Sequence, residues 1–225
     1  MTIAVNYYRS FILNTPLQVQ VPLLDRSFWL DLKSLSDGLD MLKKQKLSNI
    51  SWPQYQTDCT AHFSISHSNT AIQLKFYVKD DRFRSRQRKI NEDVNNDNCV
   101  EFFIAFNKGL SYYNLEFNCF GNAKVAYGSG RENRTFLSED AIKKIAVWTS
   151  HETVQEAFNW VIVLEIPIAV FEFSDLSTFE KMSCYGNFYK CGDELPEPHF
   201  LSWNKIDAPQ PDFHKPENFG EITFL

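Results

Sequence analysis

Acidic and amide side chains recur at alternate positions of two neighbouring segments near the middle of the chain. Glu101 belongs to the first segment, and Glu116 and Asn118 belong to the second. Carboxylates and amides form strong hydrogen bonds with the donor groups of a ligand. Two facing carboxylates can also act as acid and base on a glycosidic bond. These residues are therefore the candidate site, either for binding or for hydrolysis.

The two segments must form neighbouring strands if these side chains are to act together. Apolar residues recur at every second position on both sides of a break at residues 107–109, and this pattern predicts a β-hairpin. Antiparallel pairing places Glu101, Glu116 and Asn118 side by side on one face. The opposite, core-facing residues are Val100, Phe102, Ile104, Phe106, Tyr113, Leu115, Phe117 and Cys119.

Other alternating segments surround this hairpin, and few segments have a helical pattern. Many short strands with few helices predict an all-β fold, an antiparallel β-sandwich of immunoglobulin-like or jelly-roll type with one or two short helices. Residues 80–98 form a long polar loop between two strands. Strands are predicted at residues 61–66, 72–79, 157–166, 187–191, 199–203 and 221–224, and helices at residues 38–46 and 138–145.

Composition limits the classes of protein that this chain can belong to. At 225 residues it is expected to form one domain, residues 1–225. The net charge of −5 argues against nucleic-acid binding, which normally needs a strongly basic surface. No apolar run approaches the roughly 20 residues of a membrane helix, and no signal peptide is visible at the N-terminus. The 5 cysteines have no C-x-x-C spacing, so they predict buried thiols and neither a zinc site nor a disulfide framework.

Blocks of sequence from about residue 50 to the C-terminus resemble the family 9 carbohydrate-binding modules, specifically the family 9-like proteins of carbohydrate-utilising bacteria. The resemblance separates an N-terminal packing segment, residues 1–48, from a family-like core, residues 49–225. The blocks are I-S-W-P-Q-Y at residues 50–55, I-Q-L-K-F-Y-V at 72–78, D-N-C-V-E-F-F-I at 97–104, Y-Y-N-L-E-F-N-C-F-G at 112–121, N-F-Y-K-C-G-D at 187–193, P-H-F-L-S-W at 198–203 and P-D-F-H-K-P-E-N-F-G at 211–220.

This resemblance implies a non-catalytic β-sandwich that clamps an oligo- or polysaccharide between aromatic rings above a polar floor. It implies that Glu101 is the floor carboxylate, with Glu116 and Asn118 from the following strand. Tyr189 and Phe213 fall on further ligand-binding positions of the family. A role in saccharide utilisation, beside a separate glycoside hydrolase, and a secreted or periplasmic location are also implied; without a signal peptide the location would be cytoplasmic.

The chain departs from the family at one aromatic position. Where family members place Trp or another ring shortly before the strand of Glu101, this chain has Asn95, and Phe213 replaces what is often Trp. Phe83 or Tyr189 could then supply the missing ring. The sugar preference of relatives therefore does not carry over to this chain.

Two other functions remain open at this point. A glycoside hydrolase, or its accessory domain, would use Glu101 and Glu116 as the acid and base. A scaffold domain that has lost its ligand would show no saccharide binding and an exposed apolar patch elsewhere.

Two features of the polar loop could also bind. Arg84 and Arg86 belong to a basic strip and form a secondary candidate for contact with an anionic glycan, although a solvated loop balanced by nearby acids is the simpler interpretation. Residues 91–98 are rich in Asx oxygens, and relatives can hold a structural calcium. Asx clusters more often form turns, so no cofactor is expected and calcium is an alternative.

Overall fold

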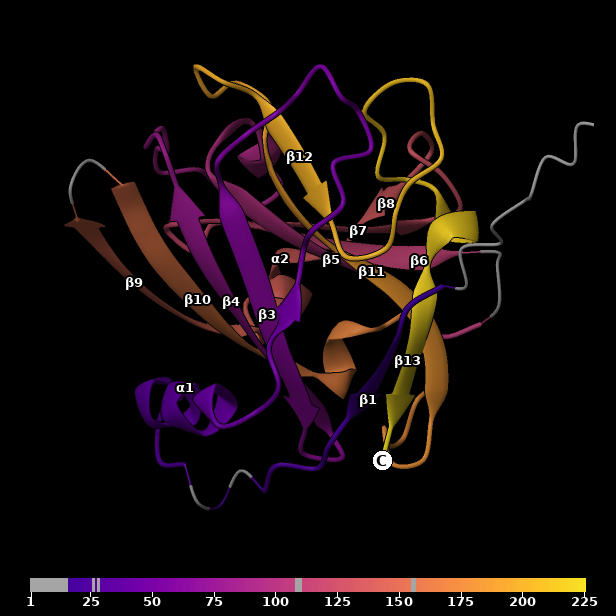
Figure 1. Ribbon diagram of the computed structural model, residues 1–225. Coiled ribbons are helices and arrows are strands. Elements are labelled where there is room, and N and C mark those ends of the chain that lie inside the picture. The colour runs from indigo at the N-terminus through magenta and orange to yellow at the C-terminus, as the bar shows by residue number, and fades with distance from the viewer. Residues whose placement is uncertain (1–15, 26, 28, 108–110, 155–156) are drawn as a thin grey trace, which may run out of the picture.

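The alternation of apolar and polar residues produces two β-sheets that face each other (Figure 1). The computed structural model describes residues 16–25, 27, 29–107, 111–154 and 157–225. Among these residues the sheets contain eight and five strands, which confirms the predicted β-sandwich. The predicted turn of the central hairpin lies partly outside the described residues, because 108–110 do not belong to them.

The larger sheet, called sheet A, contains the central hairpin. Its strands run in the order β1 (Gln18–Val21), β13 (Gly220–Phe224), β11 (Ser183–Gly192), β5 (Cys99–Ala105), β6 (Tyr112–Asn118), β7 (Ala123–Gly128) and β8 (Thr135–Phe136), and β12 (His199–Ser202) pairs with β11. β5 and β6 are antiparallel, as predicted. β1 and β13 are parallel, which departs from the predicted antiparallel arrangement. No hairpin turn joins these two distant segments, so their connection does not require antiparallel pairing.

The smaller sheet, called sheet B, forms the other layer of the sandwich. Its strands run in the order β2 (Gln45–Lys46), β3 (Thr60–His67), β4 (Ala71–Asp80), β10 (Ala157–Pro167) and β9 (Ala146–Val154). β9 is absent from the sequence prediction. It is an edge strand without a fully buried residue, so no row of core residues marks it in the sequence.

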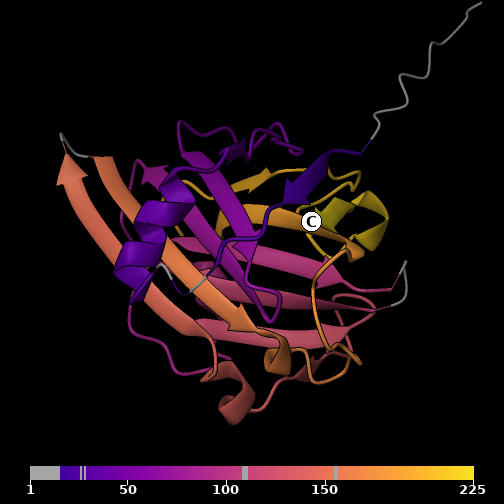
Figure 2. The same cartoon turned by 90° about the horizontal axis from the view of Figure 1, so that it is seen from below.

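The first helix begins earlier than predicted. α1 spans Leu32–Asp40 because Asp31 caps it: the backbone nitrogen of Ser34 donates to Asp31 Oδ1 at 2.7 Å. Leu35 and Leu39 then pack with Val163 on the outer face of sheet B, which α1 crosses in Figure 2. The prediction of a helix at residues 38–46 is therefore wrong.

The remaining helical elements are short. α2 (Glu139–Ile142) begins after its cap Ser138, as predicted, but ends earlier than predicted. Single 3-10 turns form η2 (Val94–Asn96), η3 (Ile168–Val170) and η4 (Pro216–Asn218). Within the described residues, no helix has the length and apolar character needed to cross a membrane.

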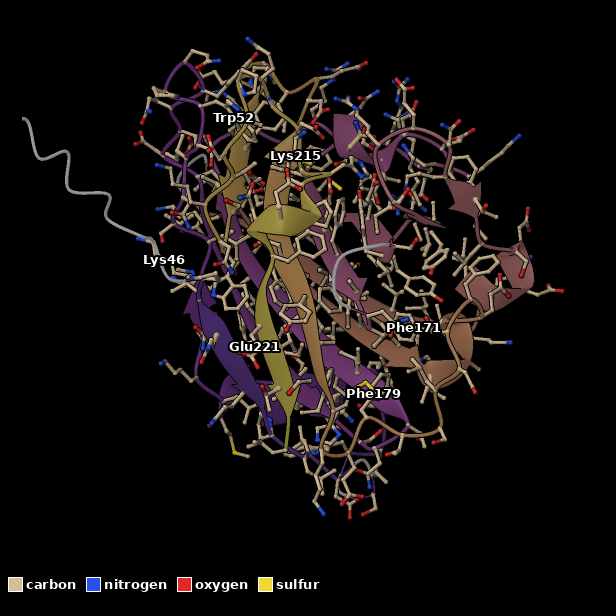
Figure 3. All side chains as sticks on the ribbon, turned by 90° about the vertical axis from the view of Figure 1, so that its right-hand side faces the viewer. Lys46, Trp52, Phe171, Phe179, Lys215 and Glu221 are labelled. Atoms are coloured by element: carbon tan, nitrogen blue, oxygen red, sulfur yellow. The ribbon has the colours of Figure 1, made fainter. Side chains whose placement is uncertain are left out.

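Aromatic rings fill the core between the sheets. Phe188 of β11 stacks on Phe63 of β3, with ring centroids 3.7 Å apart, and on Phe102 of β5 at 4.7 Å. Phe171 and Phe179 are both buried towards the lower end of the core in Figure 3. The core-facing residues predicted for the central hairpin all belong to this cluster or pack against it.

A second apolar cluster covers much of the outer face of sheet A. Trp52 and residues 206–219 pack over Phe103 and Tyr189 of that face. The polar face of the hairpin is therefore covered for most of its length. Uncovered space remains as a pocket, at whose base the candidate acids lie.

Candidate functional site

A pocket of about 310 Å³ lies over the outer face of sheet A. Strands β5, β6 and β7 form its floor, and loops before β5, after β7, after β11 and before η4 form its walls. The lining residues are Asn95, Glu101, Asn114, Glu116, Lys124, Ala126, Arg131, Arg134, Phe136, Asp193, Phe200, Pro211, Asp212, Phe213 and His214.

Strand register places the floor residues in one row. Tyr189 of β11 lies opposite Glu101 of β5, Glu101 lies opposite Glu116 of β6, and Glu116 lies opposite Lys124 of β7. Residues directly opposite in adjacent strands project from the same face of a sheet. The two predicted acids therefore do share a face, and that face points away from the core between the sheets.

The two carboxyl groups are almost completely buried. Glu101 and Glu116 each have 4% of their surface exposed. Cys191 Sγ donates to Glu101 Oε1 at 3.1 Å, and Asn114 Nδ2 donates to Glu116 Oε1 at 2.6 Å. Burial, followed by the charge of Glu116, raises the pKa of Glu101 well above its usual range, and burial also raises the pKa of Glu116. The floor thus contains two carboxyl groups that are costly to ionise without a ligand.

Arg134 fixes one wall of the pocket. Its guanidinium donates to Asn114 Oδ1 at 2.8 Å, to the backbone oxygens of Gly128 and Gly130 at 3.4 and 2.8 Å, and to those of Tyr112 and Ala126 at 2.9 and 3.2 Å. The guanidinium carbon also lies 4.5 Å from the centre of the Tyr112 ring. Arg134 therefore ties the loop after β7 to the floor strands.

Aromatic rings line opposite ends of the floor. Phe213 stacks on Tyr189, with ring centroids 4.2 Å apart and planes at 9°. Phe200 of β12 lies edge-on to Phe213 at 6.0 Å. Phe136 lies on β8, which is separated from β11 by three strands, and has 52% of its surface exposed. The pocket therefore combines an acidic floor with rings at both ends.

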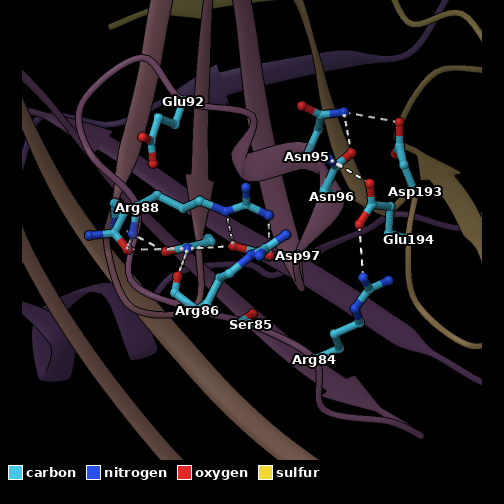
Figure 4. A network of polar contacts seen from close by, with 12 residues as sticks. Arg84, Ser85, Arg86, Arg88, Glu92, Asn95, Asn96, Asp97, Asp193 and Glu194 are labelled. Atoms are coloured by element: carbon cyan, nitrogen blue, oxygen red, sulfur yellow. Dashed lines mark hydrogen bonds and ion pairs between the residues drawn. The ribbon is translucent and has the colours of Figure 1, made fainter.

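The loop before β5 forms the wall that carries Asn95. Asn95 Nδ2 donates to Asp193 Oδ2 at 3.0 Å, and Asn96 Nδ2 donates to Glu194 Oε1 at 3.0 Å (Figure 4). Arg88 and Asp97 form an ion pair at 2.8 Å that anchors the same loop. Position 95, where family members have a ring, therefore contributes an amide to the pocket.

The structure brings three of the five predicted ligand-binding residues to the pocket lining: Glu101, Glu116 and Phe213. Tyr189 lies behind Phe213, is fully buried, and donates its hydroxyl to the backbone oxygen of Phe213 at 3.2 Å. Its position corrects the prediction of a direct ligand contact, because the Phe213 ring covers it.

Asn118 also lies outside the pocket lining, although it shares the face of the acids. Its Oδ1 accepts from the backbone nitrogens of Phe120 and Asn122, at 3.1 and 3.0 Å, and shapes a turn in which Gly121 has a φ of +80°. Its Nδ2 donates to Asp97 Oδ2 at 2.9 Å. These bonds use the amide, so the predicted role in ligand binding is corrected to a role in positioning loops.

The secondary candidates lie on the loop and not in the pocket. Arg84 forms an exposed ion pair with Glu194 at 2.8 Å, and the backbone oxygen of Arg86 accepts from Asn118 Nδ2. Neither arginine lines the pocket. Phe83 packs against Phe158, with ring centroids 4.6 Å apart, and does not replace the family's missing ring.

Most Asx residues of segment 91–98 already use their side-chain oxygens, with Asn95 Oδ1 as an exception. Asn91 Oδ1 accepts from the backbone nitrogen of Val125, Asn98 Oδ1 accepts from that of Arg84, and Asp93 Oδ1 pairs with Lys124. A calcium ion needs six to eight oxygen ligands. The residues present do not fit such a cage, and we propose no calcium site in this loop.

Several lining residues escaped the sequence prediction. Arg134 and Phe136 come from segments with no recognisable motif, and only the fold brings them to the pocket, whereas Phe200 lies in the family-like block of residues 198–203. Asp193 and His214 lie within the family-like blocks, so their sequence positions could have suggested them.

Glu116→Gln is expected to stabilise the protein near neutral pH by on the order of 1 kcal/mol. A carboxyl group whose folded pKa is raised contributes stability below its unfolded pKa, and that contribution is lost as pH rises through the folded pKa. Glutamine removes this loss and retains an oxygen for Asn114. Urea unfolding should therefore show a gain at neutral pH and none under acid conditions; an equal gain at both would contradict the proposed cause.

The fold and site define a class: a β-sandwich with an acidic and aromatic ligand pocket on one sheet. The chain belongs to carbohydrate-binding family 9, whose sequence profile matches residues 34–224. A comparison with curated proteins finds no match.

Solved structures agree with this family. A candidate carbohydrate-binding protein from Bacteroides uniformis is 30% identical, with a TM-score of 0.83, over 92% of this chain and 99% of that chain. A family 9 module from Caldicellulosiruptor kristjanssonii in complex with glucose is 13% identical, with a TM-score of 0.61, over 93% of this chain and 96% of that chain. The complex of a family 9 module from the same organism with cellotriose is 13% identical, with a TM-score of 0.57, over 92% of this chain and 93% of that chain. At this low identity the Caldicellulosiruptor structures establish the shared fold.

Proposed function

We propose that the pocket on sheet A binds one end or one unit of a saccharide and does not cleave it. The observation that carries this proposal is the row of Glu101 and Glu116 on a floor bounded by Phe213 and Phe136. A saccharide has hydroxyl groups that need hydrogen-bond acceptors and CH faces that pack on flat rings. Membership of carbohydrate-binding family 9 supports the same ligand class.

The arrangement of the acids supports binding without catalysis. Glu101 and Glu116 are direct neighbours on one face of adjacent strands. A ligand above this face meets both carboxyl groups from the same side, whereas a glycoside hydrolase places its two carboxyl groups on either side of the scissile bond. We therefore propose that the protein supports saccharide utilisation by holding sugar, beside a separate glycoside hydrolase.

Glu101→Ala is expected to weaken saccharide binding by about 10- to 100-fold, since hydrogen bonds to a charged group contribute about 1.5–3 kcal/mol. Titration calorimetry with glucose, cellotriose and xylo-oligosaccharides would measure the affinity. Phe213→Leu keeps an apolar side chain over Tyr189 but removes the ring, and is expected to weaken binding several-fold.

Glu180→Ala provides the matched control, because Glu180 is an exposed acid outside the pocket lining. Thermal unfolding of each variant would show that the fold is retained. Native affinity in a folded Glu101→Ala variant would remove the pocket floor from the binding site. Release of reducing sugar that disappears in Glu101→Gln would instead support the hydrolase.

A further inference from the structure

Three carboxyl groups of the pocket lack a direct ion pair within the described chain. Among the residues that the structure describes, Glu101, Glu116 and Asp193 form no ion pair, whereas Asp212 pairs with Lys215 at 3.4 Å. Glu101 and Glu116 are directly opposite each other on neighbouring strands, where two like charges destabilise a sheet. The charges of Lys124 and Arg131 act on these acids only from beyond ion-pair distance, so the acids of the pocket are incompletely compensated.

The cationic groups of the lining are used elsewhere or lie at the rim. Lys124 Nζ pairs with Asp93 Oδ1 at 2.9 Å, and the Arg134 guanidinium is bound by backbone oxygens and an amide. His214 is half-buried, and this desolvation lowers its pKa to about 3, so it is neutral at neutral pH. Arg131 is exposed and has no hydrogen bond or ion pair within the described chain. Lys124 lies opposite Glu116 and its charge opposes the rise in the pKa of Glu116, but its direct ion pair is with Asp93.

Apart from Lys124 Nζ, the polar atoms left available near the floor are mainly hydrogen-bond acceptors. Glu101 and Glu116 each bond through Oε1, and no bond to either Oε2 is present among the described residues. Asn95 Oδ1 is enclosed and has no partner. The neighbouring amide donors, Asn95 Nδ2 and Asn114 Nδ2, already donate to acids. A ligand group placed over Glu101 and Glu116 must therefore supply donors.

We propose that the pocket prefers a saccharide unit carrying an ammonium group, such as a 2-amino sugar, with that group held by Glu101, Glu116 and Asp193. This inference rests on the proposed saccharide binding and specifies its ligand. An ammonium group has three donors and no acceptor, which matches the unbonded carboxyl oxygens of Glu101 and Glu116. Its charge also offsets the repulsion between the two neighbouring carboxylates.

A neutral sugar matches the floor less well. Each hydroxyl brings acceptor lone pairs as well as one donor, and those lone pairs find few donors at the floor. It also leaves Glu101 and Glu116 either ionised side by side or sharing a proton. Neutral glucose can therefore bind, but with the acid pair still incompletely compensated.

Calorimetric titrations with glucosamine, glucose and N-acetylglucosamine test this preference. The three sugars share one ring stereochemistry and differ only in the substituent at carbon 2. The titrations use a low-salt buffer at neutral pH that contains EDTA. We expect glucosamine to bind at least about tenfold more tightly than glucose, and added salt to weaken glucosamine binding more than glucose binding. A deacetylated chitosan trimer should likewise bind more tightly than cellotriose.

The double variant Glu101→Gln with Glu116→Gln should reduce the ratio of glucosamine to glucose affinity to near one, while Glu180→Ala leaves the ratio unchanged. If glucose or cellotriose binds and glucosamine binds no better, the ammonium preference is overturned and the proposed function stands. If no saccharide of either set binds a folded protein, both are overturned. A ratio that persists in the folded double variant overturns the assignment to these acids.

Discussion

Lys190→Met is expected to lower the free energy of unfolding by about 3–5 kcal/mol, the cost of leaving a buried charge without its partner. Lys190 and Asp80 are both fully buried between the two sheets, with Lys190 Nζ 3.1 Å from Asp80 Oδ1. Lys190 Nζ also lies 2.9 Å from His199 Nε2. Trp160 and Asn98 donate to Asp80 Oδ2 at 2.8 and 2.9 Å. These bonds hold the carboxylate in place, so it cannot turn to solvent when the lysine is lost.

Urea unfolding followed by circular dichroism would measure this loss. Lys181→Met is the matched control, because Lys181 is an exposed lysine whose side chain is 83% accessible in its ion pair with Glu180. Exposed pairs contribute about 0–1 kcal/mol, so this control should change little. Equal, small losses in both variants would show that the Asp80–Lys190 pair is not a link between the sheets.

The pH dependence of this link has a defined sign. The Lys190 and His199 charges and the bonds to Asp80 lower the pKa of Asp80 despite burial. A carboxyl group with a lowered folded pKa contributes stability above its unfolded pKa, and this contribution is lost as pH falls through the folded pKa. The difference between the native protein and Lys190→Met should therefore be largest near neutral pH and shrink in acid.

The alternation of apolar residues was sufficient to predict the central hairpin and the shared face of Glu101 and Glu116. Each strand has a two-residue period, so the identity of one core residue fixes the direction of its neighbours. The same rule could not predict Lys190, which occupies a core-facing position of β11 between residues of the outer face. Its partner Asp80 belongs to the other sheet, and only the packing of the sheets explains a buried lysine there.

Residues contributed by loops were predictable only where a family motif contains them. Asn95 was identified as a departure, but its role as a buried acceptor depends on the fold of η2 against Asp193. Tyr189 and Phe213 were predicted as two ligand-contacting rings. The sequence could not show that one ring would stack directly on the other and cover it. Side-chain order above a sheet depends on the path of the covering loop, which carries no periodic signal.

Arg134→Met is expected to lower the free energy of unfolding by about 2–3 kcal/mol and to weaken saccharide binding at least about tenfold. Methionine has a similar length but no donor. The change leaves the carbonyls of Tyr112, Gly128 and Gly130 without their charged partner. Arg134 links these carbonyls to Asn114, which donates to Glu116. Without Arg134, the loop that forms the wall should no longer be held in place against the floor strands.

Arg134→Lys separates charge from geometry. A lysine keeps the positive charge near the acids, but its compact ammonium group cannot bridge acceptors from both sides of the loop as a planar guanidinium does. We therefore expect Arg134→Lys to reduce the free energy of unfolding and the saccharide affinity almost as much as Arg134→Met does. Arg131→Met is the control for stability, because Arg131 lies in the same loop and is exposed. The free energy of unfolding of this variant should equal that of the native protein within about 0.5 kcal/mol. Full rescue by lysine would mean that Arg134 acts through its charge and not by holding the wall in place.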